Sequence, residues 1–132
     1  MSVQEQFGQS WDVTIDADER EYSHGRSYRC RLVSAYWVPA TALATHASNY
    51  NTLTLKKGAG GTLLCASTGI TTNSSGGAAW SKGTPIAFTL TASGKDLEFD
   101  ASDVLEFIVA DAGTTASADG SLVVTWEKAR LS

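Results

Sequence analysis

The sequence predicts an all-β fold, an antiparallel β-sandwich that is jelly-roll-like. Short segments alternate apolar and polar residues with a period of two, and Gly-, Ser- and Thr-rich turns separate them at fairly regular spacing. No stretch has a convincing helical period, and a parallel sheet would require crossover helices. We therefore expect about eight short strands in two packed sheets.

The clearest strand is predicted over Ser27–Val38, where Cys30 and Leu32 share one face and Arg31 lies on the other. Pro39 is expected to end that strand because proline has no amide hydrogen to donate. The same alternation predicts strands at Trp11–Ile15, Tyr50–Leu55, Thr62–Ala66, Pro85–Thr91, Asp96–Phe99, Asp103–Ala110 and Leu122–Trp126. Polar connections are expected at Asp16–Glu21, Ser67–Ser81 and Asp111–Gly120.

The chain of 132 residues is long enough for one domain with its own core. Its first ten residues, Met1–Ser10, are polar apart from Val3 and Phe7, which indicates an extended N-terminal arm. A single sandwich domain is expected over residues 11–132.

Charge and hydropathy exclude several classes of partner. The chain has 10 Lys+Arg and 14 Asp+Glu, a net charge of −4, whereas nucleic-acid binding needs clustered basic residues. No apolar run approaches the roughly 20 residues of a membrane span. The polar residues Met1–Ser10 do not resemble a signal peptide. We expect no nucleic-acid partner and no membrane partner.

The residues that could support catalysis form no recognisable pattern. The two histidines, His24 and His46, fall in predicted loops, and the chain has no GxSxG turn for a small hydrolase. Cys30 and Cys65 lie on apolar strand faces, where they act as small buried groups or pair if their strands are neighbours. Neither cysteine has the CxxC or Cys/His spacing of a zinc site. We expect a protein that is not an enzyme and that uses no cofactor.

Two groups of carboxylates are candidate calcium ligands, since calcium takes several oxygen atoms from flexible loops. Neither group has the spacing of an EF-hand loop. The second group alternates with Leu97 and Phe99, which is typical of the solvent face of a strand, so no metal is expected. The groups are Asp16, Asp18, Glu19 and Glu21, and Asp96, Glu98, Asp100 and Asp103.

Tryptophan placement raises the question of a sugar-binding platform. Trp11 and Trp126 follow strand periodicity, so they are expected in the core. Trp80 stands in a Gly/Ser-rich loop, where it could anchor that loop, contact another subunit or bind a ligand.

Four segments carry a resemblance in pattern and spacing. They are RCRLVSAYWVPATALA, NTLTLKKGAGGTLL, PIAFTLTASGKDLEF and SDVLEFIVADAGTTASADGSLVVTW, within the region from about Ser27 to Trp126. This region resembles the small β-sandwich decoration (cement) proteins of tailed-bacteriophage capsids. The resemblance implies a jelly-roll-like homotrimer, made in the host cytoplasm, on the outer surface of the virion. There it would bind the major capsid protein and stabilise the shell by bridging neighbouring capsomers.

Within that hypothesis, Val3, Phe7 and Trp11 are expected to form the capsid-binding anchor, because an arm can add a strand to a neighbouring sheet and fill pockets. The rival interpretation is a carbohydrate- or receptor-binding module of a phage fibre or secreted protein. That rival predicts an exposed Trp80 with other aromatic rings near it.

Overall fold

The computed structural model describes residues 5–15, 19–58, 61–113 and 118–129. These residues form ten strands and one 3-10 helix, which confirms the predicted all-β sandwich. In chain order the elements are β1 (Gln6–Ile15), β2 (Glu19–Tyr22), β3 (Cys30–Pro39), β4 (Tyr50–Lys57), β5 (Thr62–Leu63), β6 (Ile70–Thr71), β7 (Ile86–Ala87), η1 (Gly94–Leu97), β8 (Glu98–Phe99), β9 (Leu105–Ala112) and β10 (Ala118–Lys128).

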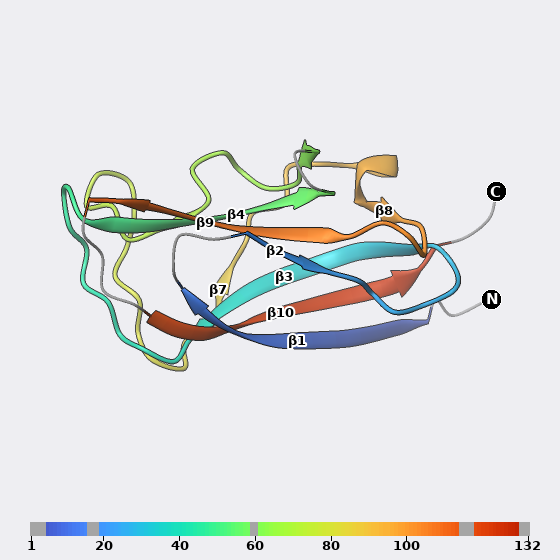
Figure 1. The fold of residues 1–132 in the computed structure, drawn as a ribbon, viewed down its shortest axis with the longest axis horizontal. Helices are drawn as coiled ribbons and strands as arrows, with labels where there is room; N and C mark the ends of the chain where they lie inside the picture. The colour runs from blue at the N-terminus through green and yellow to red at the C-terminus, as the bar shows by residue number, and fades with distance from the viewer. Residues whose placement is uncertain (1–4, 16–18, 59–60, 114–117, 130–132) are drawn as a thin grey trace.

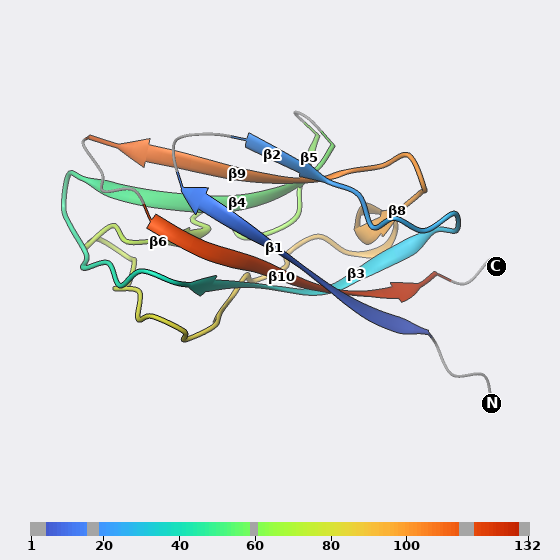
Figure 2. The same ribbon diagram turned by 60° about the horizontal axis from the view of Figure 1, so that its bottom comes forward.

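The strands form two antiparallel sheets that pack face to face (Figures 1 and 2). Sheet A has the order β1-β10-β3-β7, and β8 also pairs with β3. Sheet B has the order β2-β9-β4-β5, and β6 also pairs with β4. Successive long strands alternate between the sheets, so that β1, β3 and β10 lie in sheet A and β2, β4 and β9 in sheet B.

The pairing is nested along the chain. The first strand pairs with the last, β2 with β9, β3 with β7 and β8, and β4 with β5 and β6. A long antiparallel ribbon has thus been wrapped into a sandwich, and the further pairs β10–β3 and β9–β4 join its turns. This is jelly-roll topology.

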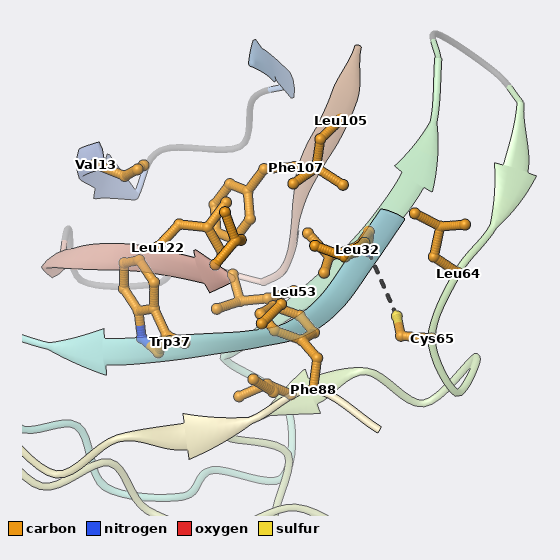
Figure 3. Close-up of a cluster of buried hydrophobic side chains, with 14 of the residues drawn as sticks. Val13, Leu32, Trp37, Leu53, Leu64, Cys65, Phe88, Leu105, Phe107 and Leu122 are labelled. Atoms are coloured by element: carbon orange, nitrogen blue, oxygen red, sulfur yellow. Dashed lines mark hydrogen bonds between the residues drawn. The ribbon is translucent and has the colours of Figure 1, made fainter. Parts of the chain in front are cut away.

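The core fills the space between the sheets with the inward-facing residues of both (Figure 3). Aromatic rings account for much of its volume: the Trp37 and Phe107 centroids are 5.7 Å apart, and those of Phe99 and Trp126 are 5.0 Å apart. Trp37 and Trp126 are fully buried. Burial of each such side chain stabilises the fold by about 1.5–3 kcal/mol.

Close packing around Trp37 explains why β10 contains Gly120. A Cβ atom at Gly120 would lie 2.4 Å from the Trp37 ring, so only glycine fits there without a shift. Gly120 pairs with Pro39, the last residue of β3, and β3 ends where the sequence predicted.

The N-terminal boundary differs from the prediction. Residues Gln6–Ser10 of the expected arm belong to β1, whose register with β10 is continuous from Gln6 to Ile15. Sparse apolar residues suggested an arm, but an edge strand needs only its main chain and one partner. Val3 lies outside the described residues.

Three other segments also differ. Glu19–Tyr22, predicted as part of a polar turn, forms the edge strand β2 on β9. The expected strand Asp96–Phe99 begins as the 3-10 helix η1, and the expected loop Ser67–Ser81 contains β6. Short segments at sheet margins depend on a partner strand far away in sequence, which local alternation does not reveal. Asp16 and Asp18 lie outside the described residues.

Candidate interaction surface

The outer face of sheet A is uncharged across its middle. Tyr36 lies between the buried residues Ala35 and Trp37, so its side chain points outward. Val123 and Ala87 are its register partners, and Ser10 pairs with Val123 on the other side. We call the central outward positions of this sheet the neutral face: Gly8, Ser10, Val33, Ser34, Tyr36, Val38, Ala87, Ser121, Val123 and Thr125.

Two large apolar side chains of the neutral face are exposed to solvent. Val33 and Tyr36 are each 40% exposed, and they are the exposed large hydrophobic residues of the described chain. A shift in register between Thr125 and Trp126 marks a bulge in β3 at Val33 and Ser34. A bulge bends its strand and re-aims side chains, which brings Val33 to the surface beside the row of Tyr36.

Charged side chains border the neutral face at both ends. At one end Arg31 pairs with Glu127, and the Gln6 amide donates to that carboxylate over 3.5 Å. At the other end Asp12 accepts a 2.9 Å hydrogen bond from Ser121 Oγ. An apolar centre that contains tyrosine and has a polar border is the usual anatomy of a protein–protein interface.

The expected anchors Phe7 and Trp11 point inward from β1. Both are half-buried and pack against the core, so Trp11 lies at the margin of the core rather than inside it. Arg26 lies over the Phe7 ring, 4.0 Å from its centroid. The Trp11 ring stacks on Tyr22 with centroids 4.2 Å apart, which connects β1 to β2 across the open side of the sandwich. With β1 paired to β10, both rings contact other residues of this chain and do not stand on a free arm.

Trp80 is buried, with 2% of its surface exposed. Its backbone exchanges hydrogen bonds of 2.8 and 3.1 Å with Leu43, and its ring packs against Trp37 with centroids 5.8 Å apart. Trp80 therefore anchors the long loop Ser67–Ser81. The sugar-binding interpretation predicted an exposed Trp80, and that prediction is wrong.

A hollow of about 280 Å³ is lined by uncharged residues, Trp80 among them. Ile70, Thr71, Gly77 and Ile86 are among its walls. Ligand sites combine apolar walls with a few well-placed polar groups. Thr71 Oγ1 is already bonded, at 2.9 Å, to the carbonyl of Asn51.

Both histidines hold the backbone of turns. His24 is buried, and its Nε2 donates to the carbonyls of Phe99 and Asp100 over 3.1 and 3.0 Å. Its Nδ1 accepts from the amide of Arg26 at 3.1 Å, which fixes the neutral Nε2–H tautomer. His46 Nδ1 likewise accepts from the amide of Asn49 at 2.8 Å.

Both cysteines are free and buried. Cys30 pairs in strand register with Phe99, whereas the backbone of Cys65 forms an isolated β-bridge with the backbone of Leu90. The Leu55 amide donates to Cys65 Sγ over 3.4 Å, the dashed line in Figure 3. Burial raises the pKa of both thiols, and for Cys65 the Leu55 amide partly opposes that effect.

The second group of carboxylates pairs with basic side chains. Arg29 Nε lies 2.7 Å from Asp100 Oδ1, and Lys57 Nζ lies 3.9 Å from Asp103 Oδ2. The Arg29 hydrogen bond, with its charge, lowers the pKa of Asp100 below its usual value. Among the residues that the structure places, no group of three or more His, Cys, Asp or Glu side chains is arranged to hold a metal ion.

In the described part of the chain, no helix is long and apolar enough to cross a membrane. The comparisons with known proteins found no matching family model, no matching curated protein and no matching solved structure. The candidate site therefore rests on the geometry of the fold alone, and it is the neutral face of sheet A.

Proposed function

We propose that the chain is a decoration (cement) protein of a tailed-bacteriophage head. It docks as a homotrimer on the outer surface of the shell, binds the major capsid protein and bridges neighbouring capsomers. It is made in the host cytoplasm and resides on the virion. The proposal combines the resemblance of the Ser27–Trp126 region with the jelly-roll topology that the resemblance implies.

One observation carries the proposal: the neutral face, with Tyr36 exposed near its centre and charges confined to its ends. Removing a charged group from water costs much free energy, whereas removing an uncharged surface costs little. A charge-free sheet face is therefore well suited to bind another protein. Tyrosine is among the residues that most often dominate binding energy. Within this proposal the neutral face replaces Phe7 and Trp11 as the capsid contact.

Trimerisation allows each single contact to be weak. When one subunit of a trimer is bound to a rigid shell, the other two bind at a high effective concentration. A modest sheet face in each copy then suffices for stable attachment. Rigid strands also lose little conformational entropy on docking, unlike a disordered arm.

The test is to mix the purified chain with expanded, empty heads assembled from the major capsid protein encoded in the same genome. Binding is measured by co-sedimentation, and the added density is located by electron cryomicroscopy. Tyr36→Arg places a charge on the neutral face, whereas the matched control Tyr50→Arg places it on the outward side of β4 in sheet B.

We expect the wild type and Tyr50→Arg to bind at symmetric positions, and Tyr36→Arg to bind at least about 30-fold more weakly, the loss of about 2 kcal/mol that defines a hot spot. Equal binding by the two variants would reject the neutral face as the contact. Absence of wild-type binding to such heads would reject the decoration function.

A further inference from the structure

We infer that β1 is an open sheet edge that pairs with β1 of a second copy of this chain, in an antiparallel register centred on Ser10. The partner is a protein strand identical to β1, so the contact is an isologous one about a two-fold axis. This contact is distinct from the subunit contact of the proposed homotrimer, because an isologous strand pair joins two copies and cannot by itself close a trimer. The inference is therefore tested on the free chain, separately from capsid binding.

The direction of the β1 main chain follows from one hydrogen bond. The Lys128 amide donates to the Glu5 carbonyl over 2.8 Å, and the β1–β10 register is unbroken from there to Ile15. In an antiparallel pair, amide and carbonyl groups of alternate residues point to the partner strand and away from it. The main-chain amide and carbonyl groups of odd-numbered residues of β1 therefore bond to β10. Those of even-numbered residues point to the free edge.

The opposite end of β1 confirms this direction. The Thr14 carbonyl, at an even position, accepts a hydrogen bond of 3.4 Å from Arg20 Nη2, which lies beyond the edge. No described residue provides a backbone partner at that edge for Gly8, Ser10 or Asp12. In Figure 1 β1 forms the lower margin of sheet A along most of its length, with no described strand drawn beyond it.

The edge has few of the features that normally prevent pairing. Natural edge strands are protected by charged side chains, above all lysine, and by proline, bulges or short length. The ten residues of β1 include no lysine and no proline, and their pairing with β10 has no bulge. Asp12 is the only charged residue among them.

Self-pairing in this register is electrostatically permitted. A pairing centred on Ser10 places Gly8 opposite the partner's Asp12, and it engages all three free positions with one another. The two Asp12 side chains are then four residues apart along the strands, about 14 Å, which exceeds the screening length of about 8 Å at physiological salt. A register centred on Asp12 would oppose two like charges directly.

The same register extends the neutral face. Even-numbered side chains of β1 lie on the outer side of sheet A, the side that bears Tyr36. Pairing of two β1 strands would therefore join two neutral faces into one continuous sheet surface.

Cysteine cross-linking of the full-length chain tests both the contact and its register. Gly8→Cys and Asp12→Cys are oxidised mildly, each alone and as an equal mixture. Gly8 accepts a side chain, since the nearest atom to its added Cβ is at 3.7 Å. Opposed residues of a hydrogen-bonded pair have Cα atoms about 5.5 Å apart, within the range that a disulfide spans. The native Cys30 and Cys65 are 0% and 1% exposed and should not compete.

We expect the mixture to give a disulfide-linked heterodimer at least about tenfold faster than either variant gives a homodimer, the ratio for a preference of about 1.4 kcal/mol. Ser10→Cys alone should form a homodimer, and the control Thr125→Cys, on the same face but on the middle strand β10, should not. Equal rates for the mixture and the single variants would overturn the inference. So would a Ser10→Cys rate no higher than that of Thr125→Cys. Circular dichroism of each variant verifies the fold.

Discussion

The two outer faces of the sandwich are built from the same kind of strand but differ in chemistry. At the centre of sheet A, Tyr36 and Val33 are exposed and charges lie only at the ends. At the centre of sheet B, threonines face outward, and Thr52 and Thr71 bond to each other over 2.9 Å. Lys56, Glu106 and Glu21 are in register across one end of that sheet, and of these Glu106 is buried, at 1% exposure.

The difference shows that folding alone does not explain the neutral face. A sheet face can present threonines and charged residues without a large exposed apolar side chain, as sheet B does. Val33 and Tyr36 each leave 40% of their surface in contact with water, and that exposed part adds nothing to the stability of the fold. Under the proposed function this exposed surface belongs to the partner contact.

The largest expected effect concerns the hydrophobic core that lies between the two sheets. Trp126→Ala, beneath sheet A, and Phe107→Ala, beneath sheet B, should each lower the free energy of unfolding by about 3–5 kcal/mol, the range for large-to-small changes in a core. Trp126→Ala also removes the 2.8 Å hydrogen bond that its indole donates to Gln9. Urea denaturation followed by fluorescence and circular dichroism measures both. A loss below about 1 kcal/mol in either variant would mean that the sheets do not share one core.

The next effect concerns His24, which lies in the β2–β3 connection and bonds to the carbonyls of Phe99 and Asp100 at the end of β8. Figure 1 shows this connection and β8 at the same end of the sandwich. His24→Phe keeps a ring against Trp126 but removes the donor to Phe99 and Asp100 and the acceptor for Arg26. We expect a loss of about 1–3 kcal/mol in unfolding free energy, the cost of leaving buried polar groups unpaired. His46→Phe, at an exposed turn, is the control and should cost less. Equal losses would contradict the buried role of His24.

The smallest effect concerns the charges that lie outside the neutral face. Arg29 lowers the pKa of Asp100, so Arg29→Gln should raise that pKa toward the ordinary value, which a carboxyl NMR titration measures. Because the folded pKa lies below the unfolded one, the pairing stabilises the fold above the unfolded pKa. That contribution disappears as the pH falls through the folded pKa. The variant should therefore lose less stability on acidification, and an unchanged Asp100 titration would contradict the pairing.

Much of the fold was predictable because local alternation records which side of a strand faces the core. The alternation of Cys30, Arg31 and Leu32 predicted the first part of β3 and its buried face, and Pro39 predicted its end. Glu19–Tyr22 was missed because its main chain, held by β9, makes the strand while its side chains resemble a turn. Trp80 was ambiguous because its burial depends on Leu43, far from it in sequence.

The candidate site was harder to predict than the fold. Beyond Val33 the residues on both faces of β3 are apolar or small, so alternation alone does not distinguish the exposed face from the buried one. The bulge at Val33 and Ser34 depends on the pairing of β3 with β10, which no local pattern specifies. Phe7 and Trp11 drew attention as apolar residues near the N-terminus, and the register of β1 turned both inward.

One matched pair of alanines tests whether the neutral face of sheet A is the docking surface. Ala87 and Ala110 are both exposed and both face outward, the first on sheet A beside Tyr36 and the second on sheet B beside Thr52. In a quantitative binding assay with empty heads, Ala87→Lys should weaken attachment at least about tenfold, a cost of about 1.4 kcal/mol, while Ala110→Lys binds like the wild type. Equal attachment by the two lysine variants would contradict the account.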